Sequence, residues 1–117
     1  MRLEGTKHLQ LYAQKAHHYE AFIVANKEGI QELIEALNKA LLEGESKADL
    51  YPSDGEGYKL YIKLLNNNDV DLFESLEMPY TDQFGLKNTH IYYEHQHKDK
   101  NAPYHPIILF KDDDSNK

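Results

Sequence analysis

The segment from Asn26 to Glu43 has the apolar spacing of a long amphipathic helix, and this feature constrains the fold more than any other. Its large apolar residues recur at intervals of three, four and seven positions: Ile30, Leu33, Ile34, Leu37 and Leu41. Asn26 is suited to cap the first turn, and Gly44 can adopt the left-handed conformation that commonly ends a helix. Because such a stripe is normally buried against another layer, we predict that Leu33, Ile34, Leu37 and Leu41 face a sheet.

The segments around this helix have the composition of β-strands. Leu9 to Ala13 and Tyr19 to Ala25 precede it and are rich in apolar and aromatic residues. Ala48 to Ser53 and Tyr58 to Leu65 follow it and flank the turn Asp54 to Gly57, which predicts a hairpin. We expect Gly55 or Gly57 to adopt positive φ in this turn.

The remainder of the chain predicts shorter elements. Val70 to Leu76 is compatible with a short helix that Pro79 prevents from continuing. Thr89 to His97 and Pro106 to Lys111 are expected to be strands, and Asp112 to Lys117 a frayed acidic tail. With 117 residues, the chain is long enough for a single domain. The predicted class is α+β, a largely antiparallel sheet with the main helix packed on one face.

The charge balance limits the classes of partner. Thirteen Lys and Arg against twenty Asp and Glu give a net charge of −7, which disfavours general binding to nucleic acid. The chain has no cysteine, so thiolate zinc sites and disulfides are excluded. The sequence has no apolar stretch of membrane-spanning length and no apolar N-terminal run typical of a signal peptide, so we expect no membrane partner and a cytoplasmic location.

The nine tyrosines are the feature most typical of a recognition surface. Tyr61 is predicted to lie on the outer face of the hairpin between Lys59 and Lys63, because alternate residues of a strand share a face. Tyr80 follows Pro79, which stiffens its loop, and Tyr92 is a third candidate. We therefore expect Tyr61, Tyr80, Tyr92, Lys59 and Lys63 to bind a ligand or partner.

A histidine-rich segment near the C-terminus offers an alternative. On a strand, His95, His97 and Asp99 would project to one face and could converge on a divalent ion, with Glu94 as a base for a hydrolase. A zinc site needs three or four ligands, and two histidines with one carboxylate are also compatible with an ordinary solvated strand. We expect no bound catalytic metal and no cofactor.

The sequence YEAFIVANKEGIQELIEALNKAL, followed by SDGEGYKLYI, resembles small accessory proteins of phages and mobile elements, of the toxin-immunity and anti-defence type. The resemblance covers about Tyr19 to Leu65. It implies a nonenzymatic protein that neutralises or sequesters a target.

The sequence leaves three alternative functions open. As a binding protein, the chain would use its acidic surface to cover a basic protein partner, or would sequester a nucleotide-derived signal by stacking a base on tyrosines. In the second case the phosphates would meet cations drawn from Lys59, Lys63, Lys98 and Lys100. The other two functions are the metal-dependent hydrolase and a structural or regulatory subunit that forms a homo-oligomer through an exposed sheet edge.

Overall fold

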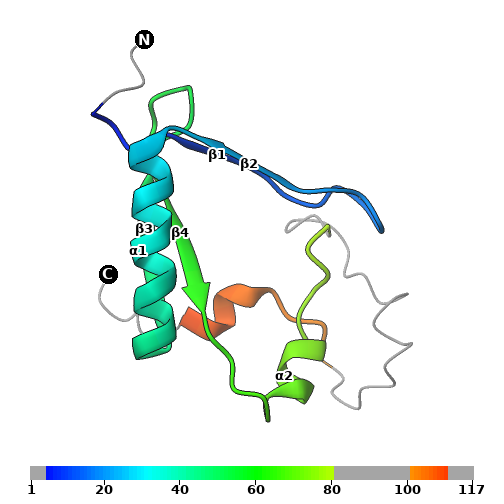
Figure 1. Cartoon of the computed structure of the whole chain (residues 1–117). Helices are drawn as coiled ribbons and strands as arrows, with labels where there is room; N and C mark the ends of the chain where they lie inside the picture. Colours follow the sequence, from blue (N-terminus) through cyan, green and yellow to red (C-terminus); the bar gives the residue numbers. More distant parts are fainter. Residues whose placement is uncertain (1–4, 81–100, 111–117) are drawn as a thin grey trace. The chain divides into compact units, whose positions relative to one another are not determined.

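The computed structural model describes residues 5–80 and 101–110 of the chain (Figure 1). The chain divides into two compact units, Met1–Leu64 and Leu65–Lys117, each described here by itself. The first unit contains β1 (Leu9–Tyr12), β2 (Phe22–Ala25), α1 (Lys27–Glu43), β3 (Glu45–Leu50) and β4 (Tyr58–Lys63). The second contains the short helix α2 (Val70–Glu74) and the 3-10 helix η2 (Pro106–Phe110). The predicted α+β class with antiparallel strand pairs and one main helix is confirmed.

Both predicted ends of α1 are confirmed. The side chain of Asn26 accepts a hydrogen bond from the backbone N–H of Gly29 at 2.8 Å, as an N-cap does. Gly44 has φ 95°, and its backbone N–H donates to the carbonyl of Ala40 at 2.8 Å. Because Gly44 turns the chain sharply, β3 begins at the next residue, three positions before the predicted start of that strand.

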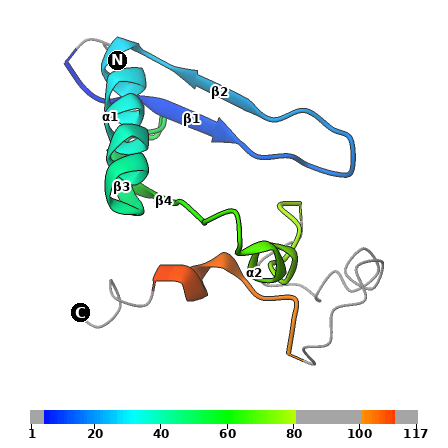
Figure 2. The same ribbon diagram turned by 60° about the horizontal axis from the view of Figure 1, so that its bottom comes forward.

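The strands of the first unit form two antiparallel pairs that meet at one point. β1 pairs with β2, with Leu9 opposite Ala25, and β3 pairs with β4. A parallel bridge between His8 and Tyr51 joins the two pairs, and the N–H of Leu9 donates to the carbonyl of Tyr51 at 2.9 Å. Of the strands that the structure describes, β2 and β4 therefore lie at the outer edges, and Figure 2 shows β2 beside β1.

The core between α1 and the strands is built around small helix residues. The buried positions of α1 are Gly29, Ala36 and Ala40. A Cβ atom at Gly29 would lie 2.0 Å from the carbonyl oxygen of His8, so only glycine fits there without movement of the backbone. Ala36 packs with Leu9, Ala48 and Leu50, which are fully or almost fully buried. The hydroxyl of Ser46 on β3 donates to the carbonyl of Ala36.

The prediction that the large apolar residues of α1 face the sheet is wrong for most of them. Leu33 is partly buried and packs against the core. The other members of the stripe are exposed: Ile30 by 39%, Ile34 by 50%, Leu37 by 46% and Leu41 by 68%. The physical reason is that the small residues Gly29, Ala36 and Ala40 bring the helix backbone close to the strands. The larger side chains lie on another side of the helix and therefore remain exposed.

The turn between β3 and β4 follows the prediction. Gly55 has φ 80°, a conformation that strains any residue with a side chain. The backbone N–H of Glu56 donates to Oδ1 of Asp54 at 2.9 Å, which holds the turn locally.

In the second unit, α2 confirms the short helix, whereas the predicted strand from Pro106 to Lys111 is wrong. The described part of that segment is the 3-10 helix η2, in which the N–H of Ile108 donates to the carbonyl of His105 at 3.2 Å. Proline lacks the N–H that a strand ladder requires, and its fixed φ suits the first turn of a helix. The His105 ring nitrogen Nδ1 accepts from the N–H of Ile107 at 3.1 Å. The expected strand Thr89 to His97 and the tail Asp112 to Lys117 lie outside the described residues.

A short bridge links two segments of the second unit. The N–H of Tyr104 donates to the carbonyl of Ser75 at 2.7 Å, and the N–H of Glu77 donates to the carbonyl of Tyr104 at 2.7 Å. Ser75 is buried, and its hydroxyl donates to the carbonyl of Leu72 at 2.7 Å, so its polar group is satisfied. Neither α2 nor any other helix in residues 5–80 and 101–110 has the length and apolar character needed to cross a bilayer.

We predict that Leu50→Ala lowers the free energy of unfolding by about 2 to 5 kcal/mol, because it leaves a cavity in the core. Leu37→Ala should lower it by less than about 1 kcal/mol, because that side chain is already 46% exposed. Urea melts of the two variants test this difference. A loss at Leu37 as large as that at Leu50 would show that the stripe is buried.

Candidate functional site

The outer face of the β3–β4 hairpin carries three of the residues predicted from the sequence to bind a ligand or partner, Lys59, Tyr61 and Lys63. Three directly opposed pairs of residues occupy it: Glu45 and Lys63, Lys47 and Tyr61, and Asp49 and Lys59. The Lys59 ammonium lies 2.7 Å from Oδ1 of Asp49, and the Lys63 ammonium lies 2.8 Å from Oε1 of Glu45. The two lysines expected to meet a ligand are therefore engaged in cross-strand ion pairs.

Tyr61 occupies the predicted position between the two ion pairs. It lies opposite Lys47, on the strand face that alternates with the core-packed residues Leu60 and Ile62. Its side chain is half-buried. The register thus agrees with the expected placement of Tyr61, and its part in binding stays a prediction.

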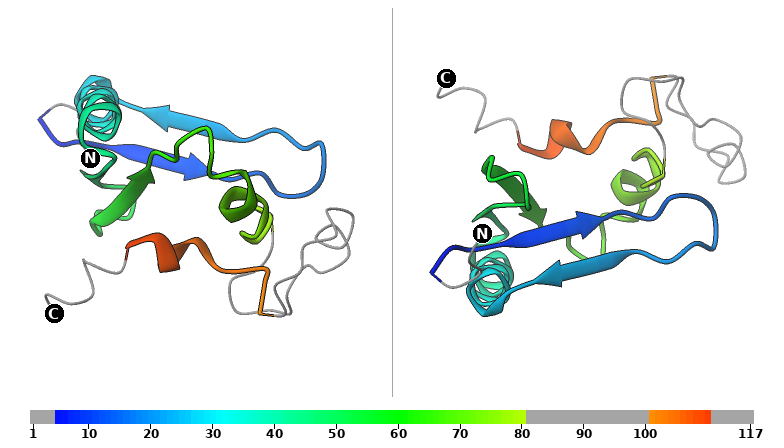
Figure 3. Two further views of the ribbon diagram at one scale, coloured as in Figure 1. Left: turned by 90° about the horizontal axis from the view of Figure 1, so that it is seen from below. Right: turned by 90° about the horizontal axis from the view of Figure 1, so that it is seen from above.

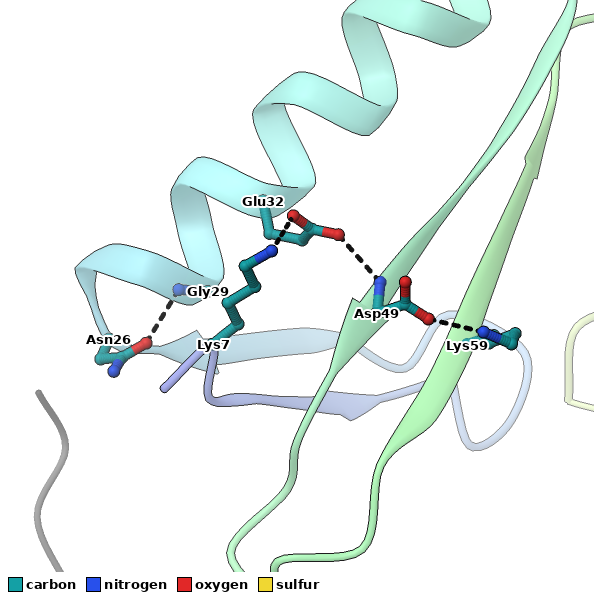
Figure 4. Close-up of polar contacts among 6 residues, drawn as sticks. All are labelled: Lys7, Asn26, Gly29, Glu32, Asp49 and Lys59. Carbon is teal, nitrogen blue, oxygen red and sulfur yellow. Dashed lines mark hydrogen bonds and ion pairs between the residues drawn. The ribbon is translucent and has the colours of Figure 1, made fainter. Parts of the chain in front are cut away.

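A chain of polar contacts links this outer face to α1 (Figure 4). The Lys7 ammonium lies 2.9 Å from Oε1 of Glu32, and the N–H of Asp49 donates to Oε2 of Glu32 at 3.0 Å. Asp49 in turn binds Lys59. Glu32 therefore joins the N-terminal segment, the helix and β3 through one carboxylate.

The pKa values of these groups follow their contacts. The backbone N–H of Asp49, followed by the ammonium of Lys7, holds the pKa of the Glu32 carboxyl below its ordinary value. The hydrogen bond from Lys59 lowers the pKa of Asp49, and the same bond raises the pKa of Lys59. The hydrogen bond to Glu32 likewise raises the pKa of Lys7. All four groups are consequently held in their charged forms at neutral pH.

A surface hollow of about 690 Å³ lies beside Tyr51, at the turn end of the β3–β4 hairpin. The side chains that line it include Lys7, His8, Asp49, Tyr51, Ser53 and Asp54. The Tyr51 backbone is fixed by its N–H, which donates to the carbonyl of Lys7 at 2.9 Å. A Cβ atom at Gly57 would come within 3.0 Å of the Tyr51 ring, so the ring lies directly against that glycine.

Tyr51 lines this hollow, but it is not one of the tyrosines predicted from the sequence to bind a ligand. The sequence contains one relevant pattern, a glycine six positions after Tyr51 that leaves space for an aromatic ring. The hollow carries two carboxylates, Asp49 and Asp54, and one lysine that is already paired with Glu32. Its chemistry favours a ligand with hydrogen-bond donors or positive charge over one with phosphates.

The other predicted site residues are not gathered at this face. Tyr80 belongs to the second unit, where it is half-buried, and its hydroxyl is buried without a hydrogen-bond partner in the described part of the chain. Tyr92 and the metal candidates His95, His97 and Asp99 lie outside the described residues. Within residues 5–80 and 101–110, no group of three or more His, Cys, Asp or Glu side chains could hold a metal ion.

Two groups of large apolar residues in the described part of the chain are exposed, and neither was predicted from the sequence to be a binding site. We call the first the helix stripe, which comprises Ile30, Ile34, Leu37 and Leu41. The second is the β1–β2 arm, the hairpin Leu9–Ala25. Its strands expose five large apolar side chains, each between 44% and 60%: Leu11, Tyr12, Phe22, Ile23 and Val24. Several large apolar side chains exposed on one element are typical of protein contact sites.

The chain was compared with protein-family models, curated proteins and solved structures, and nothing matches. The resemblance to small accessory proteins of phages and mobile elements therefore stays a prediction. A function for the chain has to be inferred from its own residues.

We predict that Glu32→Gln reduces the pH dependence of stability. A carboxyl whose folded-state pKa is lowered stabilises the fold above its unfolded pKa, and this contribution is lost as the pH falls through the folded-state value. Urea melts between about pH 6 and pH 2 should therefore show a smaller loss of unfolding free energy for Glu32→Gln than for the original chain. Glu43→Gln, at an exposed position of the same helix, is the matched control and should behave like the original. Equal slopes for all three proteins would contradict the role of Glu32.

Proposed function

We propose that this chain is a nonenzymatic binding protein that recognises a protein target by placing α1 in an apolar groove of that target. The observation that carries the proposal is the exposure of the helix stripe. Ile30, Ile34, Leu37 and Leu41 follow one another at intervals of four, three and four residues. This is the spacing of anchor residues in helices that bind grooves.

The helix is well prepared for such binding. Asn26 caps its first turn, Gly44 ends its last turn, and the small buried residues hold it against the strands. A helix that is already ordered loses little conformational entropy when it binds. The stripe therefore offers apolar contact on a rigid element.

The charge of the chain indicates which residues would border the groove of the target. The exposed polar residues of α1 include Glu35 and Glu43, and the chain carries a net charge of −7. A groove bordered by lysine or arginine would be attracted to this surface and aligned by it. By occupying such a groove the chain would neutralise its target, which is the role implied by the resemblance to immunity and anti-defence accessory proteins.

The contacts of the outer face favour a protein over a nucleotide-derived signal as the target. Lys59 and Lys63, two of the cations expected to meet phosphates, are each bound to a carboxylate. A phosphate would have to displace Asp49 and Glu45 from them, in a chain whose net charge of −7 repels it. The hydrolase alternative gains no support from the described residues, since its candidate ligands lie outside them.

The proposal predicts that Leu37→Lys weakens target binding strongly while it lowers the free energy of unfolding by less than about 1 kcal/mol, because it places a charge at the centre of the exposed stripe. Leu42→Lys is the matched control, since Leu42 is 86% exposed on the same helix but lies outside the stripe. The original chain and both variants would be used to capture proteins from cells that produce the chain. A protein retained by the original and by Leu42→Lys, but not by Leu37→Lys, would then be purified and its affinity measured by calorimetry.

We expect the purified pair to bind more than about tenfold more weakly with Leu37→Lys, which corresponds to a loss above about 1.4 kcal/mol. Equal binding by all three proteins would overturn the helix proposal. Unfolding of Leu37→Lys would do the same, because it would mean that another part of the chain covers the stripe.

Tyr61→Ala tests the outer face in the same assay. If the target binds there, Tyr61→Ala should weaken binding by about 1 to 3 kcal/mol at an unchanged melting temperature, and Leu37→Lys should have no effect. The sequence makes the same prediction for Tyr80→Ala. The opposite pattern, with Leu37→Lys weakened and both tyrosine variants unchanged, would assign recognition to α1.

A further inference from the structure

The edge strand β2 lacks the features that usually protect the edge of a sheet. β1 is its partner on one side, and no strand of the described residues pairs with it on the other (Figures 2 and 3). The other edge strand of this unit, β4, carries Lys59 and Lys63, and charged side chains hinder pairing with a further strand. β2 has the sequence FIVA, without charge, proline or glycine. Within residues 5–80 and 101–110, the outer edge of β2 is therefore left without a paired strand.

Both faces of the β1–β2 arm are apolar as well. Leu11 lies opposite Ile23 on one face, and Tyr12 lies opposite Phe22 on the other. All four side chains are exposed by at least 44%. A two-stranded hairpin is only marginally stable in water, and a third strand or a cover on its apolar face adds the missing stabilisation. The arm is thus incomplete as a structural element.

We propose that a second copy of this chain completes the arm, with β2 of one copy pairing antiparallel with β2 of the other across a two-fold axis. The two hairpins then form one continuous sheet. This inference rests on the arm and is independent of the proposed use of the helix stripe.

Symmetry restricts the register of this pairing. A two-fold axis perpendicular to the sheet keeps the same face of each copy on the same side, so opposed residues must share a face within their own chain. Two central registers meet this condition, with either Ile23 or Val24 opposite its own counterpart. We take the first, because it also places the aromatic Phe22 opposite the β-branched Val24 of the second copy. β-Branched and aromatic residues in such positions form favourable cross-strand pairs.

The charges of the arm favour a copy of the chain over a different partner. Neither β1 nor β2 contains a charged residue, although the chain as a whole carries −7. A basic partner would therefore find no complementary charge along this edge, whereas an identical strand matches its neutrality. At the ends of the paired strands, the register brings the exposed Glu20 of one copy near the exposed Lys27 of the other, which is a favourable combination.

The proposed contact combines apolar side chains with backbone hydrogen bonds. Half-exposed Tyr and Phe rings offer on the order of 100 Å² each, and aliphatic side chains about half of that. The five exposed apolar side chains of the strands thus offer at most about 350 Å² per copy, or about 700 Å² for two copies, an area typical of a weak, concentration-dependent contact. The backbone hydrogen bonds of the new strand pair add directional contacts.

Cysteine crosslinking tests the pairing directly, because the chain contains no cysteine of its own. In the proposed dimer, Ile23→Cys brings two thiols to directly opposed positions, within the distance that a disulfide spans. Mild oxidation should convert most of this variant to a covalent dimer. Lys39→Cys, at an exposed position of α1, is the matched control and should crosslink far more slowly. Equal crosslinking of the two variants would overturn the proposal.

The dimer itself is measured by light scattering after gel filtration over a range of concentrations. We expect the original chain to be dimeric and Val24→Lys to dissociate more than about tenfold more easily, because a lysine on an edge strand hinders its pairing with a further strand. A monomeric original chain, or a Val24→Lys variant that dimerises as well as the original, would overturn the proposal.

If Val24→Lys does not fold, a pair of milder variants tests the proposed dimer. Glu20→Lys should weaken the dimer by up to about fivefold, and the double variant Glu20→Lys with Lys27→Glu should restore it. Restoration in the double variant supports the antiparallel register. Weakening by Glu20→Lys without restoration would overturn that register.

Discussion

The close approach of α1 to the strands determines the arrangement of the first unit. Gly29 allows the helix to touch the carbonyl of His8, and Ala36 and Ala40 allow it to lie against β3. The hydroxyl of Ser46 donates directly to a helix carbonyl, which larger side chains between the two backbones would prevent. Because packing of this kind is short-range, adding even one methyl group at Gly29 would require the backbone to move.

The same approach explains why large apolar side chains lie on the surface. A helix that packs through glycine and alanine buries little apolar area of its own, and its leucines and isoleucines remain available to a partner. The β1–β2 arm is uncovered for a related reason, since it meets the rest of the unit through its first residues, His8 and Leu9. The two proposed protein contacts use these two groups of exposed side chains.

The ordered polar contacts limit what the outer face of β3–β4 can do. Lys59 and Lys63 stabilise the hairpin through their cross-strand carboxylates, and Glu32 connects α1 to Lys7 and to the backbone of Asp49. A phosphate would have to displace these carboxylates to reach the two lysines, and the binding role of Lys59 and Lys63 stays a prediction. The ion pairs depend on the register between β3 and β4, which strand alternation within β4 does not specify.

The sequence by itself determined the local structure, because local structure depends on neighbouring residues. This holds for the caps Asn26 and Gly44, for the turn at Gly55 and for the strand alternation that places Tyr61 on the outer face. It did not determine which side of α1 is buried, because a periodic stripe shows that a helix has an apolar side but not how closely its small residues approach a sheet. It also misassigned Pro106–Phe110, where His105 and the proline favour a helical turn over a strand. Tyr51 and the β1–β2 arm became visible only in the tertiary structure, because exposure and strand edges depend on contacts between residues distant in the chain.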